Sequence, residues 1–471
     1  MKKAQFLLML VLLVGVFAAP ALAQDDAGFP DFIQHTECEE DLTGQNIEIL
    51  HFGDLSGSYA FITQPLLVGL EDAINYYNSN GGVCGATLSQ RFDDTAGVPD
   101  QVVATYDRFS TEDPKPQLLV LYASGDAEAL RDRVAEDEIP VLISAGSVPG
   151  LYGDDGATPG WIFATNPLYT DQLGSFCDFV GNDPMGVFGE GQSIGYISWE
   201  GAFGRAADTE EVWSYCESVG VSHAGSEFFL PTTQDISAQV QNLVDAGATI
   251  LYTNSLATGP ALVAATVVNL GLEDQVVLAG VNWALDTSVG LLGQATFGSD
   301  GLPSTDGLFG SAPFYWWTET DQPGIALIRE QFDAAAETAP ESHTPTTQNI
   351  AYLLGWQTVD LYTEIYIQTA NRVGFENITG ADIKETIEGL DYSPLGLTTI
   401  NFQEGRRSTS ANRIAMMGYL AEDGASMADA ENPPMVVTVG ERQLLVPINV
   451  ALTDFVDAPD LRPGGADVPE G

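Results

Sequence analysis

The sequence predicts an α/β protein of two lobes, each a parallel sheet flanked by helices. Strand and helix patterns alternate from Asn46 onward, and the same rhythm restarts after Phe163. Such alternation is typical of parallel sheets covered by helices. The length of 471 residues exceeds that of one ordinary core, and 45% of the residues are hydrophobic, which favours a globular chain with more than one core.

The first lobe begins with a β-rich run at residues 47–52. The helix after it carries Leu66, Leu70, Ile74 and Tyr77 at spacings of four, four and three, and Gly81-Gly82 ends it. Further strands are predicted at 87–92, 118–122 and 141–143. The helices between them present one apolar face each, formed by Val102, Tyr106 and Phe109, and by Ala127, Leu130 and Val134.

The second lobe is predicted to open with a helix at 169–180 and a strand at 194–199. Its later strands are expected at 228–230, 250–252 and 276–278, with apolar-faced helices between them. In the last third, a helix at about 348–372 carries an aromatic stripe that suits core packing, and short strands follow at 400–402, 414–420 and 435–439. The Pro-, Gly- and Asp-rich end predicts a flexible tail.

The chain is strongly acidic: 66 Asp and Glu against 16 Lys and Arg give a formal charge of −50. A surface this negative repels phosphate backbones and anionic lipid head groups, so we expect no nucleic-acid partner. Solubility and tolerance of salt are the simplest roles for this charge.

The N-terminus has the pattern of a secretory signal peptide. Lys2 and Lys3 precede an apolar run at 6–18, and an Ala-x-Ala sequence ends at Ala23. No cysteine stands directly after Ala23, so we expect no lipid anchor and a periplasmic or extracellular location. Four cysteines in an exported chain suggest two disulfides. Three pairings are possible, and we favour Cys38–Cys84 and Cys177–Cys216 because each then links parts of one lobe.

Catalytic signatures are scarce. The sequence has no G-x-S-x-G elbow, no H-E-x-x-H and no phosphate-binding loop. No C-x-x-C occurs and the four histidines are scattered, so we expect neither a metal nor a cofactor. Dispersed catalytic residues would leave no motif, so an exported hydrolase stays open as an alternative.

Loops at the carboxyl ends of the predicted strands are the candidate binding site, because ligands of open α/β sheets bind at that edge. Serine hydroxyls and free N–H groups at a helix start suit a carboxylate, although plain helix capping explains the same residues. Aromatic rings beside glycines in the second lobe suit contact with a small ligand. The candidate ligand-binding residues are Ser56, Tyr59, Phe61, Ser124, Gly125, Asp126, Ala145, Gly146, Ser147, Phe203, Asn254, Asn282 and Trp283.

Several of these segments resemble the solute-binding proteins of branched-chain amino-acid-type ABC transporters. The loop at 53–60 resembles that family's G-x-x-S/T-G-x-x-A sequence, and residues 74–82 resemble its I-N-x-x-G-G helix end. Asp93-Asp94-Thr95, the strand entry at 136–144 and Phe203-Gly204-Arg205 match in the same order. The resemblance covers about residues 45–425.

The resemblance implies two Rossmann-like lobes, a three-segment hinge and a ligand cleft between the lobes. We therefore expect this division: signal peptide 1–23, N-terminal extension 24–44, lobe I at 45–165 and 308–394, lobe II at 166–307 and 395–452, and a flexible tail at 453–471. It also implies that the loops at 124–126 and 145–147 hold a ligand carboxylate and that Phe203 covers it.

Two departures from the family pattern bear on the ligand. Where amino-acid binders place a glutamate for the ammonium group, this chain has Asn282, with Asp126 or Asp286 as possible substitutes. The first-lobe Ser-Ser pair appears as Ala123-Ser124-Gly125. The ligand stays open between an amino acid, an amide and a carboxylate. We expect a monomeric, non-enzymatic binding protein that delivers its solute to an ABC permease, with ligand sensing without transport as the alternative.

Overall fold

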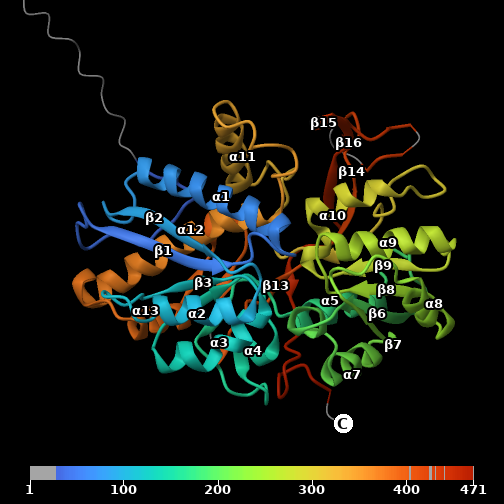
Figure 1. Ribbon diagram of the computed structural model, residues 1–471, viewed down its shortest axis with the longest axis horizontal. Helices are drawn as coiled ribbons and strands as arrows, with labels where there is room; N and C mark the ends of the chain where they lie inside the picture. Colours follow the sequence, from blue (N-terminus) through green and yellow to red (C-terminus); the bar gives the residue numbers. More distant parts are fainter. Residues whose placement is uncertain (1–27, 403–404, 424–426, 430, 440, 470–471) are drawn as a thin grey trace, which may run out of the picture.

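A computed structural model describes residues 28–402, 405–423, 427–429, 431–439 and 441–469. It has two α/β lobes side by side, joined by crossing segments near β13 (Ala411–Asn412) (Figure 1). This is the predicted fold class. The predicted signal peptide lies outside the described residues, as does the start of the extension at 24–44.

The sheet of lobe I is parallel throughout, with the strand order β2-β1-β3-β4-β5. Its strands are β1 (Asn46–Gly53), β2 (Thr87–Asp94), β3 (Leu119–Leu121), β4 (Val141–Ile143) and β5 (Ile162–Ala164). Its helices are α1 (Ala60–Ser79), α2 (Pro99–Phe109), α3 (Ser124–Glu136), α4 (Val148–Tyr152), α11 (Pro323–Ala336), α12 (Ile350–Val373) and α13 (Gly380–Glu388). Because apolar residues of β1 and β3 point alternately to the two faces, one face packs on α1 and α12, the other on α2, α3 and α4.

The long helix α12 packs against α1 at very short range. A Cβ added to Gly69 would lie 2.4 Å from the carbonyl oxygen of Tyr352, and one added to Gly355 would lie 2.6 Å from the backbone nitrogen of Leu70. Only glycine permits this approach of two helix backbones. The predicted face Leu66, Leu70, Ile74 and Tyr77 of α1 is buried, as its spacing required.

The sheet of lobe II is mixed, in the order β17-β14-β10-β9-β8-β6-β7. Its strands are β6 (Ser193–Trp199), β7 (Ser222–Phe229), β8 (Ile250–Thr253), β9 (Val277–Gly280), β10 (Phe309–Ser311), β14 (Ile414–Tyr419) and β17 (Pro447–Ala451). The strands from β6 to β10 pair in parallel, and β14 and β17 are antiparallel additions. The strand predicted at 228–230 is the longer β7, because it pairs along all of β6.

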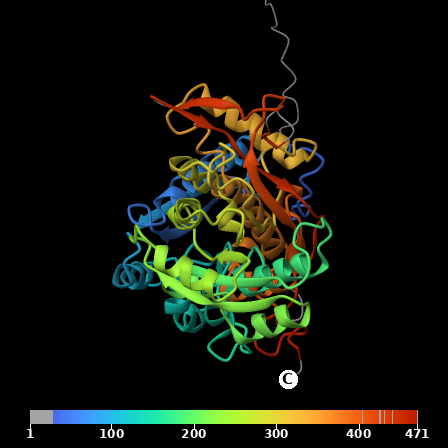
Figure 2. The same ribbon diagram turned by 90° about the vertical axis from the view of Figure 1, so that its right-hand side faces the viewer.

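The helices of lobe II are α5 (Tyr169–Asn182), α6 (Ala202–Arg205), α7 (Glu210–Ser218), α8 (Ser237–Asp245), α9 (Thr258–Leu270) and α10 (Thr287–Leu292). The 3-10 turn η1 (Asn282–Leu285) follows β9 directly. A hairpin of β15 (Val436–Val439) and β16 (Arg442–Leu445) extends this lobe at one end, as the turned view shows (Figure 2).

Three chain segments cross between the lobes and hydrogen-bond to one another. The first runs over 165–168, and Ala164 N donates to the carbonyl of Arg407 in the third crossing at 2.6 Å. Ala312 N, just after β10, donates to the carbonyl of Arg413 at 2.8 Å. Two predicted boundaries are wrong. The second crossing follows Ser311 and not residue 307, because β10 pairs within the sheet of lobe II.

The third crossing is displaced further. It was expected after residue 394, but β12 (Ile400–Asn401) pairs with β11 (Asp391–Tyr392), and Leu395 N donates to Asp360 of α12 at 2.6 Å. Phe402 packs its ring on Phe163 of β5. These contacts keep the chain in lobe I until past Phe402.

Both favoured disulfides are present. Cys38–Cys84 fastens the N-terminal extension to lobe I, and Cys177–Cys216 joins α5 to α7 in lobe II. The extension is held further by Thr36, whose hydroxyl donates to Glu364 of α12 at 2.5 Å.

The predicted flexible tail is wrong for the residues that the structure describes. β18 (Val456–Asp457) pairs with β13, and Leu461 is fully buried. Composition misled here because two apolar side chains, Leu461 and Ala458, are enough to pack the segment against the protein. Within the described residues, no helix is long and apolar enough to cross a membrane.

Candidate functional site

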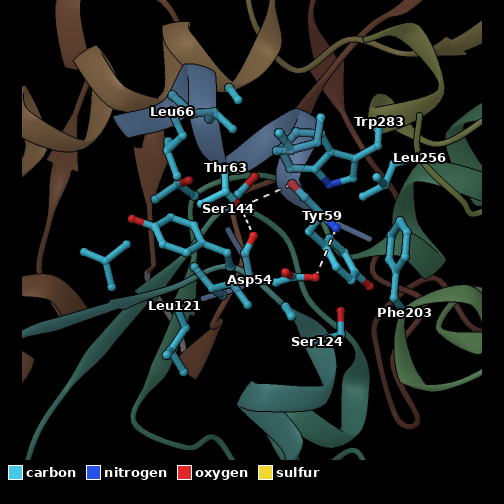
Figure 3. A pocket seen from close by; sticks show the side chains of 18 of the residues that line it. Asp54, Tyr59, Thr63, Leu66, Leu121, Ser124, Ser144, Phe203, Leu256 and Trp283 are labelled. Carbon is cyan, nitrogen blue, oxygen red and sulfur yellow. Dashed lines mark hydrogen bonds between the residues drawn. The ribbon is translucent and has the colours of Figure 1, made fainter. Parts of the chain in front are cut away.

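A small cavity lies between the lobes at the carboxyl ends of the lobe I strands (Figure 3). Lobe I lines it with Asp54, Tyr59, Ile62, Thr63, Leu66, Val120, Leu121, Tyr122, Ala123, Ser124, Leu142, Ile143, Ser144, Thr165, Ala351, Leu354 and Thr358, and lobe II with Tyr169, Phe203, Leu256 and Trp283. Its volume of about 50 Å³ holds about three water molecules. A larger ligand therefore needs the lobes to part before it can enter.

The loop after β1 is held rigid by Asp54. Its carboxylate accepts hydrogen bonds from Gly57 N at 2.5 Å and Tyr59 N at 3.1 Å, and its carbonyl accepts one from the Thr63 hydroxyl at 2.6 Å. These bonds fix the loop that precedes α1 and place Tyr59 at the cavity. Both carboxylate oxygens of Asp54 thus already accept hydrogen bonds from the loop.

The start of α3 presents a polar corner. The Ser124 hydroxyl is buried at the cavity wall with no hydrogen-bond partner among the described residues. Across from it, Ser144 Oγ accepts a bond from Asn166 Nδ2 at 3.1 Å. The first-turn N–H groups of a helix lack intrahelical acceptors and carry partial positive charge. This corner can therefore accept a carboxylate or amide oxygen.

Asp126 follows Ser124 in the same turn of α3. Burial, and then the nearby negative charge of Asp54, raise the pKa of Asp126 to about 7. Its carboxyl group can thus be neutral or charged near neutral pH. In the charged form it suits a cationic group, and in the neutral form it can donate a hydrogen bond.

Lobe II supplies an aromatic wall. The Phe203 ring lies 5.1 Å from the Tyr169 ring and 6.3 Å from the Tyr59 ring of lobe I, centroid to centroid. Trp283 Nε1 donates to the Tyr169 hydroxyl at 3.1 Å. Asn254 Nδ2 donates to the Phe203 carbonyl at 2.7 Å, which fixes the turn that carries the ring.

Tyr122 is oriented from behind by His51. The Tyr122 hydroxyl lies 2.6 Å from His51 Nδ1, and burial lowers the pKa of His51 to about 3. The imidazole is therefore neutral, and it holds Tyr122 against the cavity without adding charge. No lysine or arginine is among the residues that line the cavity.

The cavity brings together four of the predicted site residues: Tyr59, Ser124, Phe203 and Trp283. Gly125 and Asp126 do not line it but follow Ser124 in the first turn of α3, where Gly125 faces Ala202 of α6 across the cleft. Asn254 supports Phe203 from behind. Asn282 is fully buried in η1, and its side-chain amide has no hydrogen-bond partner among the described residues.

Other predicted residues lie elsewhere. Ser56 is exposed, and Phe61 is 53% exposed beside a groove shared with α10. Ala145, Gly146 and Ser147 turn away from the cavity, because Ser147 caps α4 by accepting from Gly150 N at 3.3 Å and donates to Glu128 at 2.6 Å. Capping, and not ligand contact, explains this serine.

Asp286 is also structural. It accepts hydrogen bonds from Ser288 N at 2.8 Å and from Ile350 N of α12 at 3.2 Å. This buried carboxylate caps α10 and ties lobe II to α12, so it is not free to meet a ligand ammonium. Of the two substitutes for the ammonium partner, only Asp126 lies near the cavity: it does not line it, but its charge acts on Tyr59, which does.

Sequence reasoning missed several wall residues. Ser144 directly follows the strand β4, so the strand-end rule that gave Ser124 applies to it as well. Leu256 lies four residues after the strand predicted at 250–252, and Tyr169 begins the helix predicted at 169–180. Ala351, Leu354 and Thr358 come from the buried helix α12, whose sequence shows no sign that part of it faces a cavity. Within the described residues, no cluster of three or more potential metal ligands occurs.

The sequence profile described as periplasmic binding protein matches residues 46–424. The chain belongs to this family. Membership implies an extracytoplasmic location and a solute-binding role. Among curated proteins, none matches the chain.

Solved structures of other periplasmic binding proteins share the fold. A branched-chain amino-acid ABC transporter protein from Thermus thermophilus with bound valine has a TM-score of 0.66 at 15% identity, covering 88% of this chain and 97% of that one. A fatty acid ABC transporter substrate-binding protein from Thermomonospora curvata gives 0.65 at 17%, covering 92% and 97%.

A solute-binding protein from R. palustris in complex with 4-hydroxybenzoate gives 0.64 at 14%, covering 88% and 98%. At these identities the likeness shows the two-lobed fold of this periplasmic binding protein and not its ligand.

Proposed function

We propose that this periplasmic binding protein captures a small solute with a carboxylate or amide group and an apolar body, and delivers it to an ABC permease. The observation that carries the proposal is the cavity itself. It is lined from both lobes and has a polar corner, at Ser124 and Ser144, in a wall that is mostly apolar and aromatic. The other polar residues of that wall are Asp54, Thr63, Thr165 and Thr358.

The polar corner suits the oxygen atoms of the solute. The unpartnered Ser124 hydroxyl and the start of α3 offer donors, and a carboxylate gains most there because helix starts attract negative charge. Since the wall offers no cation, a ligand with two or more carboxylates would leave charge buried without a partner, which costs binding free energy.

The apolar side of the solute would contact Leu66, Leu121, Leu354, Phe203 and Trp283. Burying apolar surface contributes about 25 cal/mol per Å², so these contacts select for a hydrocarbon or aromatic body. An α-amino acid, its amide or a simple aromatic or aliphatic acid all fit this description. Asp126 decides among them, because only an amino group gains from its ionised form.

Binding would act through closure. In the closed form Phe203 of lobe II and Tyr59 of lobe I meet over the cavity, so a ligand that contacts both rings binds the closed form more tightly and shifts the population toward it. A permease that recognises the closed pair of lobes then engages mainly the loaded protein and takes up its solute.

The test is isothermal titration calorimetry of the chain from residue 24 onward with L-leucine, L-valine, isobutyramide, isovalerate and 4-hydroxybenzoate. We expect saturable one-to-one binding of at least one of them, with a negative heat-capacity change from apolar burial. Absence of binding by all members, in folded protein, would contradict the proposed ligand class. Delivery is tested separately, by solute uptake into permease-containing vesicles with and without the protein.

A further inference from the structure

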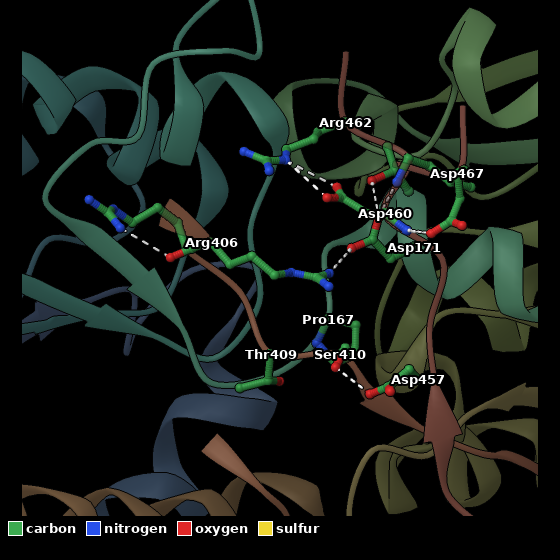
Figure 4. A network of polar contacts seen from close by, with 12 residues as sticks. Pro167, Asp171, Arg406, Thr409, Ser410, Asp457, Asp460, Arg462 and Asp467 are labelled. Carbon is green, nitrogen blue, oxygen red and sulfur yellow. Dashed lines mark hydrogen bonds and ion pairs between the residues drawn. The ribbon is translucent and has the colours of Figure 1, made fainter. Parts of the chain in front are cut away.

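The C-terminal residues 456–468, here called the strap, lie beyond the region that matches the family profile, which ends at residue 424. They run beside the crossing segments between the lobes (Figure 4). β18 at the start of the strap pairs with β13, and Ala458 N donates to the carbonyl of Ser410 at 2.7 Å. Ser410 Oγ donates to Asp457 at 2.6 Å. The strap is therefore fixed to the third crossing.

The strap is then anchored to lobe II. Leu461 is fully buried against α5, where a Cβ on Gly174 would lie 2.4 Å from its side chain. Leu461 N donates to the carboxylate of Asp171, in the first turn of α5, at 3.0 Å. Asp171 is itself fully buried and lies 3.7 Å from the guanidinium of Arg406 in the third crossing.

The next two residues of the strap contact lobe I. The Arg462 guanidinium lies over the ring of Tyr152, 4.7 Å from its centroid. Pro463 packs on Gly156, where a Cβ would lie 2.5 Å from the proline ring. Gly156 also has a φ of +66°, a conformation that favours glycine. Lobe I thus receives the strap through a close fit at the end of α4.

The strap is stiffened between its anchors. Asp460 N donates to Asp467 at 2.8 Å, and Arg462 Nε donates to Asp460 at 3.1 Å. Gly465 N donates to the carbonyl of Arg462 at 2.7 Å. These bonds close the chain into a compact turn, so the anchors on α4 and α5 are joined by a short, braced segment and not by a slack one.

We propose that the strap holds the two lobes in the closed orientation and thereby sets how much of the ligand-free protein is closed. Leu461 contacts α5 of lobe II, whereas Arg462 and Pro463 contact lobe I near the end of α4. These two sets of contacts lie on opposite sides of the first crossing. Rotation of one lobe about that crossing has to break one set of contacts. The closed population, in turn, scales the apparent ligand affinity. The proposal rests on the two-lobed closure of the proposed function, but not on any particular ligand.

The test measures lobe separation in ligand-free protein by single-molecule energy transfer. Dyes are placed at positions 98 and 270, exposed sites of lobe I and lobe II, through unnatural amino acids that leave the disulfides intact. Two variants are compared with the parent chain: deletion of residues 459–471, and the double substitution Arg462→Gln with Pro463→Ala. Arg372→Gln is the matched control, since it removes an arginine paired with Glu385 far from the crossings.

We expect the deletion to lower the closed fraction at least threefold, the double substitution to lower it in the same direction, and the control to leave it unchanged. An unchanged distribution in a folded deletion variant and in the double variant would overturn the proposal. If the deletion variant fails to fold, the double variant alone decides. Because no ligand is added, failure here is distinguishable from failure of the proposed solute class.

Discussion

The ring centroids of Phe203 in lobe II and Tyr59 in lobe I lie 6.3 Å apart, and the two rings meet across the cleft between the lobes (Figure 3). Both rings are carried by segments that follow strands: Tyr59 follows the loop after β1, and Phe203 sits in the short α6 after β6. Each is braced locally, Tyr59 through Asp54 and Phe203 through Asn254. The pair therefore forms a contact between the two lobes across the cleft.

Replacing Phe203 by alanine is expected to weaken binding of the cognate solute by at least tenfold, while the melting temperature of the ligand-free protein falls little. The ring covers the ligand, and a tenfold loss corresponds to about 1.4 kcal/mol. Calorimetric titration and thermal melting measure the two effects. Phe228→Ala, a ring of the same lobe under Arg205 and away from the cavity, is the control. Equal losses of affinity and stability in Phe203→Ala would mean that this residue serves packing alone.

Ser124→Ala and Ser147→Ala should have opposite effects. The Ser124 hydroxyl makes no hydrogen bond to the residues that the structure describes, so its removal should leave stability unchanged and lower ligand affinity about five- to tenfold. Ser147 caps α4, so its removal should lower the free energy of unfolding by about 1 kcal/mol and leave affinity unchanged. Chemical denaturation and titration of both variants check this; reversed effects would move the binding corner from α3 to α4.

Asp126 should make stability depend on pH. Its pKa in the folded protein is about 7, above the ordinary value of 3.8, so the folded state binds more protons than the unfolded state between these values. The free energy of unfolding then falls as pH rises from about 4 to 7, by up to about 4 kcal/mol, and levels off above.

In Asp126→Asn this contribution should vanish, so the variant gains stability relative to the parent as pH rises. Burial raises the pKa of Asp171 to about 7 as well, but that residue is present in both proteins and its effect cancels in the comparison. Denaturant unfolding at pH 4, 5.5, 7 and 8 measures the difference. Parallel curves for the two proteins would show that Asp126 titrates normally.

The disulfide linking α5 to α7 should be detectable in the secreted protein. Mass spectrometry of nonreduced peptides is expected to show Cys177 joined to Cys216. Loss of this bond in Cys177→Ser with Cys216→Ser should lower the free energy of unfolding by about 2–4 kcal/mol, because the cross-link restricts the unfolded chain. Free thiols at both positions in the native protein would contradict this pairing.

The sequence predicted what depends on local pattern. The spacing of Leu66, Leu70 and Ile74 was enough to define the buried face of α1, and the strand-end rule located Ser124. The same rule also predicted Ser147 as a ligand-binding residue, because the sequence does not tell whether a serine at a helix start contacts a ligand or caps its own helix. In the structure Ser147 Oγ accepts a hydrogen bond from Gly150 N and so caps α4.

Other features depend on contacts between distant segments. The wall formed by Leu354 and Thr358 arises because α12 returns to lobe I after a long excursion through lobe II. The third crossing was placed too early because the β11–β12 pairing gives almost no pattern in two-residue strands. The Pro and Gly content of the tail predicts flexibility. In the structure the tail is ordered, because Leu461 is buried and Pro463 packs closely on Gly156.

The central claim is that closure over a small solute with a carboxylate or amide group is what this protein does. A thermal-shift titration of the chain from residue 24 onward tests it most directly, with L-leucine, L-valine, isobutyramide, isovalerate and 4-hydroxybenzoate at rising concentrations. A ligand that binds only the native state raises the melting temperature in proportion to the logarithm of its concentration once above its Kd. The account predicts such a rise for at least one member, and predicts that it begins only at much higher concentration in Ser124→Ala with Phe203→Ala. A melting temperature unmoved by every member, or a rise that begins at the same concentration in the double variant, would contradict it.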